Sequence, residues 1–140
     1  MATTNANITI SSDITTNPIT ISKSMVMHKF QSNVGLEETT GLQAKKFAAT
    51  TAVTIVAYTE GTPAKASKVY IRNTGASTTD FFYVGYGEDL GAATIETIGR
   101  LYGGNWMLIP WDAVAATTHD IYAKSSTAEP MHIEYMAFIE

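Results

Sequence analysis

Hydrophobic and polar residues alternate along most of the chain with a period of two, the pattern of β-strands that bury one face. The clearest run covers residues 53–58, where Val53, Ile55 and Ala57 share one face and the residues between them share the other. Similar runs, separated by turn-forming residues, predict about eight strands. They cover residues 25–30, 53–58, 69–72, 81–86, 95–102, 106–111, 121–124 and 131–139.

The spacing of these runs predicts one all-β domain, an antiparallel β-sandwich, over residues 25–140. Gly103 and Gly104 separate two of the strands, and adjacent glycines favour the tight turn of a hairpin, with a positive φ at one of them. Only residues 42–49 and 112–116 are compatible with a helical turn, and each is equally well a plain loop. The inward faces are expected to include Val53, Ile55, Val69, Ile71, Ile109, Ile133 and Tyr135.

Residues 1–24 form a separate region that is small and polar except for two similar segments, Ile8-Thr9-Ile10-Ser11 and Ile19-Thr20-Ile21-Ser22. Each segment alternates like a strand, but two short strands are too little to fold alone. We therefore expect an extended N-terminal arm that crosses to a neighbouring subunit or to the surface of another protein. A frayed tail, or a strand pair within the arm's own sandwich, is an equally good interpretation. The expected interface residues are Ile8, Ile10, Ile19 and Ile21.

Composition narrows the possible partners. The chain has 140 residues, the usual size of one domain, and only 16% of them are charged, whereas 21 are Thr and 9 are Ser. The net charge of -4 and the lack of a basic stripe argue against direct nucleic-acid binding. The absence of Cys fits assembly in a reducing cytoplasm. Because no signal peptide and no long apolar run is visible, we expect a soluble protein that is not inserted in a membrane.

Candidate chemistry is sparse. The three histidines, His28, His119 and His132, lie far apart in the sequence, so no metal or cofactor is expected. No Gly-x-Ser-x-Gly motif holds a nucleophile, so we expect no catalytic residues and no enzyme. The segment Gly85-Tyr86-Gly87-Glu88-Asp89 lacks the lysine of a phosphate loop and the alternating oxygens of a calcium loop. It is interpreted as a strand-ending turn.

Five aromatic residues are concentrated in one third of the chain: Tyr83, Tyr86, Tyr102, Trp106 and Trp111. Aromatic side chains in a two-layer sheet usually fill the core, and that is our expectation here. If several pointed outward, they would form a platform for sugar rings, with Asp89 or Asp112 bonding hydroxyl groups. A carbohydrate-binding module is therefore an alternative function.

Several segments in the second half of the chain form a recognisable series. They are Val69-Tyr-Ile-Arg-Asn-Thr-Gly75, Asp80-Phe-Phe-Tyr-Val-Gly-Tyr-Gly87, Ile98-Gly-Arg-Leu-Tyr-Gly-Gly104, Trp106-Met-Leu-Ile-Pro-Trp111, Asp120-Ile-Tyr-Ala-Lys-Ser-Ser-Thr-Ala128 and Ile133-Glu-Tyr-Met-Ala-Phe138. This series resembles small virion structural proteins of tailed bacteriophages. It consists of core and turn patterns, so it carries over no binding residues.

The resemblance implies a jelly-roll-like sandwich without catalytic activity. Within the family it favours a capsid decoration or cement protein, which binds the assembled capsid shell and stabilises it. The implied partners are the major capsid protein and further copies of the chain, as a homotrimer. The implied location is the virion, assembled in the host bacterial cytoplasm. A tail or head-tail component is the alternative within the same family.

Overall fold

The computed structural model describes residues 4–13, 19–29, 31–36, 38–61, 65–86, 96–113 and 119–140. Within these ranges the regular structure consists of strands and one short 3-10 helix, η1 (Tyr58–Glu60). The strands are β1 (Asn5–Ser12), β2 (Ile19–Val26), β3 (Glu38–Thr39), β4 (Gln43–Phe47), β5 (Ala52–Val56), β6 (Ser67–Asn73), β7 (Phe81–Tyr86), β8 (Glu96–Tyr102), β9 (Trp106–Trp111), β10 (Ile121–Ser125) and β11 (Met131–Ile139).

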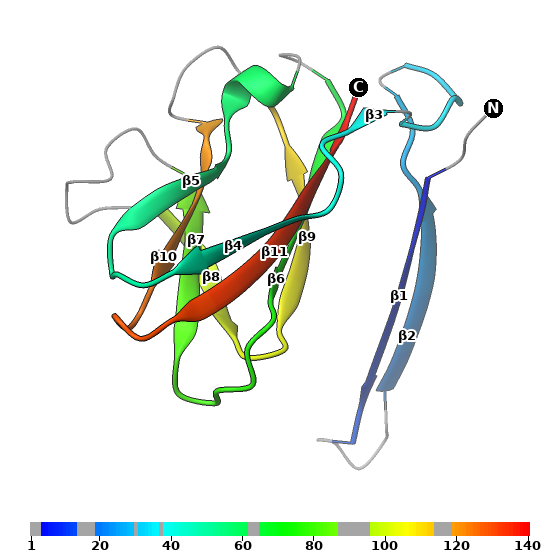
Figure 1. Cartoon of the computed structure of the whole chain (residues 1–140). Coiled ribbons are helices and arrows are strands. Elements are labelled where there is room, and N and C mark those ends of the chain that lie inside the picture. The colour runs from blue at the N-terminus through cyan, green and yellow to red at the C-terminus, as the bar shows by residue number, and fades with distance from the viewer. Residues whose placement is uncertain are drawn as a thin grey trace.

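Strands β3 to β11 form two antiparallel sheets that pack face to face (Figure 1). The five-stranded sheet has the order β3-β11-β6-β9, with β4 also paired to β11, and the four-stranded sheet has the order β5-β10-β7-β8. The chain changes sheet at most of its connections, including β4 to β5, β6 to β7, β8 to β9 and β10 to β11. This arrangement is a jelly-roll-like antiparallel sandwich, so the predicted fold class is confirmed.

The core lies between the two sheets, on the faces that the alternation predicts. Five of the expected inward residues are buried, and the other two, Val53 and Ile109, are partly buried against the same cluster. The buried five are Ile55, Val69, Ile71, Ile133 and Tyr135. Phe47 of one sheet meets Phe82 of the other edge-to-face, with ring centroids 5.0 Å apart. The strand phase read from the sequence is therefore correct for these residues, but in β5 Val56 of the opposite face is also buried, where the pairing with β10 shifts register.

The turn at Gly103 and Gly104 differs from the expected hairpin. Strand β8 pairs with β7 and strand β9 pairs with β6, so the turn carries the chain from one sheet to the other. Gly104 has a φ of 79°, as a tight turn requires. Gly103 has no room for a side chain, because a Cβ there would lie 2.6 Å from the backbone N and O of Ser77.

Buried Asn73 holds the same corner together. Its Nδ2 donates to the carbonyl of Leu101 at 2.9 Å, and its Oδ1 accepts from the backbone N–H of Gly75 at 2.9 Å. The backbone N–H of Gly104 donates to the carbonyl of Asn73 at 3.0 Å. These bonds join β6 of one sheet to β8 of the other and satisfy an amide that is fully buried.

Two further expectations about local structure are wrong. Residues 25–30 do not form a separate strand, because Met25 and Val26 pair with β1 and complete β2, and His28 forms only an isolated bridge to Gly35; residue 30 lies outside the described residues. Residues 42–49 contain strand β4 in place of a helical turn, since pairing with β11 overrides the local preference of an Ala- and Lys-containing segment. Of residues 112–116, only the first two are described.

The N-terminal arm forms a hairpin of its own. Strands β1 and β2 pair with each other from Asn5↔Val26 to Ser12↔Ile19 and make a separate two-stranded sheet. Figure 1 shows this hairpin standing beside the sandwich, next to β9. At its base, the backbone N–H of Met27 donates to the carbonyl of Thr4 at 2.9 Å, and the Thr4 hydroxyl donates to the carbonyl of Leu36 at 2.9 Å.

Candidate functional site

The β1–β2 hairpin has one apolar and one polar face. Residues directly opposite each other in an antiparallel pair point to the same side of the sheet. The register therefore places Ala6, Ile8 and Ile10 on one face together with their partners Met25, Lys23 and Ile21. The other face consists of Asn5, Asn7, Thr9, Ser11, Thr20, Ser22, Ser24 and Val26. The apolar face is the one that the sequence nominated as an interface.

Much of the apolar face of the hairpin is uncovered. Ile10 is 55% exposed and Ile21 is 45% exposed, although the two lie opposite each other, two pairs from the Ser12↔Ile19 end of the hairpin. Met25 is 41% exposed, whereas Ile8 is partly buried. Of the four predicted interface residues, the structure thus brings Ile8, Ile10 and Ile21 together; the side chain of Ile19 lies outside the description.

The hairpin faces the outer side of the five-stranded sheet, which we call the outer face. Three rows of opposed residues cross β11, β6 and β9 on this face. The rows are Glu134–Arg72–Trp106, Met136–Tyr70–Leu108 and Phe138–Lys68–Pro110. One end of the outer face is therefore charged and the middle is apolar. Pro110, which lacks a backbone N–H, is tolerated because β9 is an edge strand.

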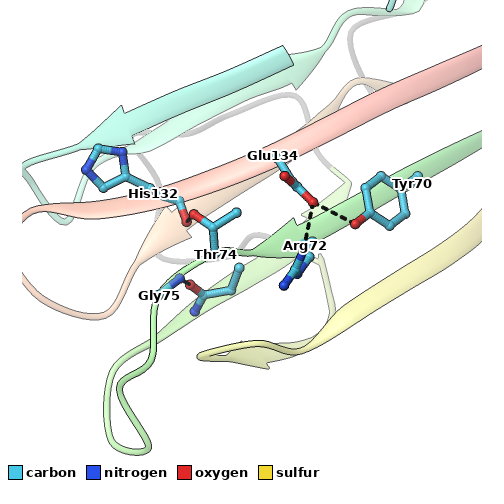
Figure 2. Close-up of polar contacts among 7 residues, drawn as sticks. Tyr70, Arg72, Thr74, Gly75, His132 and Glu134 are labelled. Atoms are coloured by element: carbon cyan, nitrogen blue, oxygen red, sulfur yellow. Dashed lines mark hydrogen bonds and ion pairs between the residues drawn. The ribbon is translucent and has the colours of Figure 1, made fainter. Parts of the chain in front are cut away.

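A polar network fixes the charged end. Glu134 Oε1 accepts a hydrogen bond from the Tyr70 hydroxyl at 2.7 Å and lies 3.4 Å from Arg72 Nη1 (Figure 2). Burial raises the pKa of the Tyr70 hydroxyl, and the hydrogen bond to Glu134 and the charge of Glu134 raise it further. In the next row the Thr74 hydroxyl donates to the carbonyl of His132 at 3.1 Å.

Two depressions meet on the outer face. The apolar groove, of about 340 Å³, lies between the hairpin and the sheet. Ala6 and Ile8 line its hairpin side, and Leu108, Met136 and Phe138 line its sheet side. The polar groove, of about 500 Å³, is lined by Tyr70, Arg72, Gly104 and Trp106. Tyr70 and Trp106 belong to both depressions, so the two form one continuous surface.

The predicted aromatic residues divide between core and surface. Trp111 is buried, 3% exposed, and its indole N–H donates to the carbonyl of His119 at 2.8 Å. Tyr83, Tyr86 and Tyr102 are partly buried. Trp106 is 49% exposed on the outer face. The expectation of a core position is therefore right for Trp111 and wrong for Trp106, because β9 places the two five residues apart on opposite faces of an edge strand.

A second aromatic cluster lies on the outer side of the four-stranded sheet. Phe81 contacts Tyr83 and Tyr102, with ring centroids 4.8 Å and 5.0 Å apart. The Arg100 guanidinium lies over the rings of Phe81 and Tyr83, 4.9 Å and 5.3 Å from their centroids. The Arg100 guanidinium therefore occupies the faces of Phe81 and Tyr83 on which a sugar ring would stack.

Sequence reasoning did not nominate Tyr70, Arg72 or Glu134. The alternation did place these side chains outward, because their neighbours Val69, Ile71 and Ile133 were assigned to the core. What it could not supply is the pairing of β6 with β11, which joins Arg72 to a glutamate 62 residues away. Arg72 and Glu134 can be recognised as neighbours, and so as a candidate site, only when the register of β6 with β11 is known.

The histidines are dispersed in the structure. His28 and His132 are exposed and His119 is partly buried. No group of three or more His, Cys, Asp or Glu side chains that could hold a metal ion occurs among the described residues. Asp112 is exposed, while Glu88 and Asp89 lie outside the part of the chain that is described. No helix in the described ranges is long and apolar enough to cross a membrane.

Comparisons with known proteins assign the chain to no family. No family model matches the sequence, and no curated protein matches it. The crystal structure of a mitogen derived from Yersinia pseudotuberculosis is 11% identical, with a TM-score of 0.43, over 74% of this chain and 86% of that one. The cupin domain of Cnp3 from Schizosaccharomyces pombe is 16% identical, with a TM-score of 0.37, over 97% of this chain and 84% of that one. Neither similarity carries a conclusion about function.

Proposed function

We propose that the chain is a non-enzymatic structural protein that attaches to a larger assembly through its N-terminal hairpin. The observation that carries this proposal is the uncovered apolar face around Ile10 and Ile21. The assembly that we propose is the capsid shell of a tailed bacteriophage, to which the chain binds as a decoration or cement protein. This choice of assembly rests on the sequence resemblance.

The hairpin is poorly suited to stand alone. A two-stranded sheet is marginally stable in water unless another layer covers one of its faces. Ile10 and Ile21 are each about half exposed, so covering them would contribute on the order of 1 kcal/mol for each side chain. A partner surface supplies this missing layer. The major capsid protein is the partner we propose, because a hairpin that projects from a compact sandwich can reach across a subunit boundary.

Weak individual contacts suffice for such a role. A decoration protein meets many identical sites on a symmetric shell, and copies that associate as a trimer bind several of these sites together, which multiplies the apparent affinity. The polar face of the hairpin suits exposure to water, since it presents amides and hydroxyls such as the Thr9 and Ser22 pair, 3.3 Å apart. The apolar face of the hairpin would then be the face that contacts the capsid shell.

Substitutions on the two faces of the hairpin test the proposal. We expect Ile10→Thr combined with Ile21→Thr to lower binding to empty capsids of the bacteriophage that encodes the chain, measured by cosedimentation. The melting temperature of the sandwich should stay nearly unchanged, because neither hairpin strand pairs with the sandwich. Thr9→Ala combined with Ser22→Ala is the matched control, since these side chains are opposite each other on the polar face. The control should bind like the natural chain.

Two other outcomes would contradict the proposal. Cosedimentation with purified tails but not with capsids would assign the chain to the tail or the head-tail junction. Binding to capsids that is equal for the isoleucine variant and the natural chain would remove the hairpin from the interface.

A further inference from the structure

We propose that the polar groove on the outer face binds a neutral oligosaccharide, with one sugar ring stacked on Trp106. The proposal concerns a site that the hairpin attachment does not use, since Ile10 and Ile21 do not line this groove. It therefore goes beyond the structural role, and either proposal can fail without the other.

Trp106 supplies the stacking surface. It is 49% exposed, whereas tryptophan is usually highly buried. The neighbouring Gly104 has a φ of 79°, and no atom lies within 4 Å of the position that a Cβ would occupy there. The groove is consequently open on the side of Gly104. An apolar ring next to open space suits the flat C–H face of a sugar.

Arg72 supplies a polar contact inside the groove, and Glu134 lies next to Arg72, just outside the residues that line the groove. They occupy the same row as Trp106, so their charged groups lie along one line across the sheet. Adjacent hydroxyl groups of a sugar can accept hydrogen bonds from a guanidinium and donate to a carboxylate. Among the described residues, no hydrogen bond reaches Glu134 Oε2, so this oxygen is available as an acceptor.

The polar network is set in place before a ligand arrives. Tyr70 donates to Glu134 Oε1 at 2.7 Å, and Arg72 lies 3.4 Å from the same oxygen. The carboxylate is thereby held against β6 from two sides, and less freedom is lost when a ligand binds. Figure 2 shows these three side chains gathered above β6 and β11.

Charge selects a neutral ligand. Arg72 and Glu134 compensate each other, so the groove offers no net positive charge to a phosphate or carboxylate. The chain as a whole has a net charge of -4, which disfavours a polyanion such as nucleic acid. A purely apolar ligand would remove water from Arg72 and Glu134 without replacing the hydrogen bonds that the water made. A neutral polyol with one apolar face satisfies both parts of the groove.

Tryptophan fluorescence provides the primary test. The probes are neutral tri- to pentasaccharides of glucose, mannose, galactose and N-acetylglucosamine, titrated up to about 10 mM. Because Trp111 is only 3% exposed, a change in emission reports on Trp106. We expect at least one series to change the emission and to saturate. No response from any of these sugars would overturn the proposal.

Variants measured by titration calorimetry localise the site. Trp106→Ala and Arg72→Met should each weaken binding by about tenfold or more, the usual consequence of losing a stacking ring or a charge-assisted hydrogen bond. Arg100→Met is the matched control, because Arg100 is an exposed arginine beside aromatic rings on the other sheet. Unchanged binding by Trp106→Ala, or tighter binding of sulfated than of neutral oligosaccharides, would refute this assignment.

Discussion

At the scale of single residues, Tyr70 connects the two halves of the outer face. Its ring lines both grooves, and its hydroxyl donates to Glu134. Burial raises its pKa above the ordinary value of 10.0, as burial also does for Tyr86 and Tyr135. All three phenols therefore keep their protons in the folded chain at a pH where the unfolded chain begins to lose them.

These shifts predict a loss of stability in alkali. A raised pKa in the folded state contributes stability that is fully present below the unfolded value, about 10, and is lost as the pH rises through the folded value. The free energy of unfolding, measured in urea from about pH 8 to pH 11, should therefore fall above about pH 10. Tyr70→Phe removes one of the three groups and should make the fall shallower.

Glu134→Gln offers a second check on the same residue. The glutamine lacks the negative charge that adds to the effect of burial, so the pKa of Tyr70 should move back part of the way towards 10.0. Absorbance at the phenolate band follows this titration directly. The contribution of Tyr70 is the difference between the curve of each chain and that of the same chain with Tyr70→Phe, and an identical Tyr70 titration with Glu134 and with Gln at this position would contradict the assignment.

At the scale of elements, the corner between β8 and β9 depends on Gly103. A Cβ at this position would lie 2.6 Å from the backbone of Ser77, which cannot move as a flexible side chain could. We expect Gly103→Ala to destabilise the fold by about 1–3 kcal/mol, the usual cost of forcing extra atoms into a packed site. Thermal and urea unfolding measure this difference.

Gly99→Ala is the control for the corner. Gly99 lies in β8, and no atom lies within 4 Å of its Cβ position, so alanine there should be neutral or slightly stabilising. Equal unfolding of the two variants would mean that Gly103 is not tightly packed against Ser77.

Most strands of the sandwich could be predicted from the sequence, but β3, β4 and several connections could not. Alternation and turn residues located β7, β9 and β11 at the bounds observed. The Gly103-Gly104 turn was expected in a hairpin. Two adjacent glycines indicate a tight turn, but they do not show whether the flanking strands pair with each other or belong to different sheets. Strand β4 was missed since its conformation is imposed by β11, which lies far away in the sequence.

At the scale of the whole molecule, the described residues form a sandwich and a separate two-stranded hairpin. Among the described residues, neither β1 nor β2 pairs with a strand of the sandwich, and the bonds at the base join Thr4, Met27 and Leu36 to one another. We predict that a variant lacking residues 1–26 melts within about 4 °C of the full chain, which corresponds to about 1 kcal/mol. Differential scanning calorimetry measures this value. Collapse of the truncated sandwich would mean that the hairpin belongs to its fold.

The candidate site follows from the whole molecule more than from any segment. The sequence identified the isoleucines of the hairpin because alternation is a local property. It identified Trp106 only as one aromatic residue among five, since exposure depends on which strand lies at the edge of a sheet. The row that joins Trp106 to Arg72 and Glu134 draws on three strands, and their order in the sheet is set by packing of the complete core.

Tyr70 and Trp106 line both grooves, so binding in one groove can change the binding affinity of the other. A molecule that fills one groove and reorients either ring changes the shape of the other groove. The resulting change in affinity must be equal in both directions: the factor by which a ligand in one groove changes binding in the other is the factor by which the second ligand changes binding of the first. A molecule in the apolar groove would thus change the affinity of the polar groove for its ligand, and a ligand in the polar groove would change the affinity of the apolar groove to the same extent.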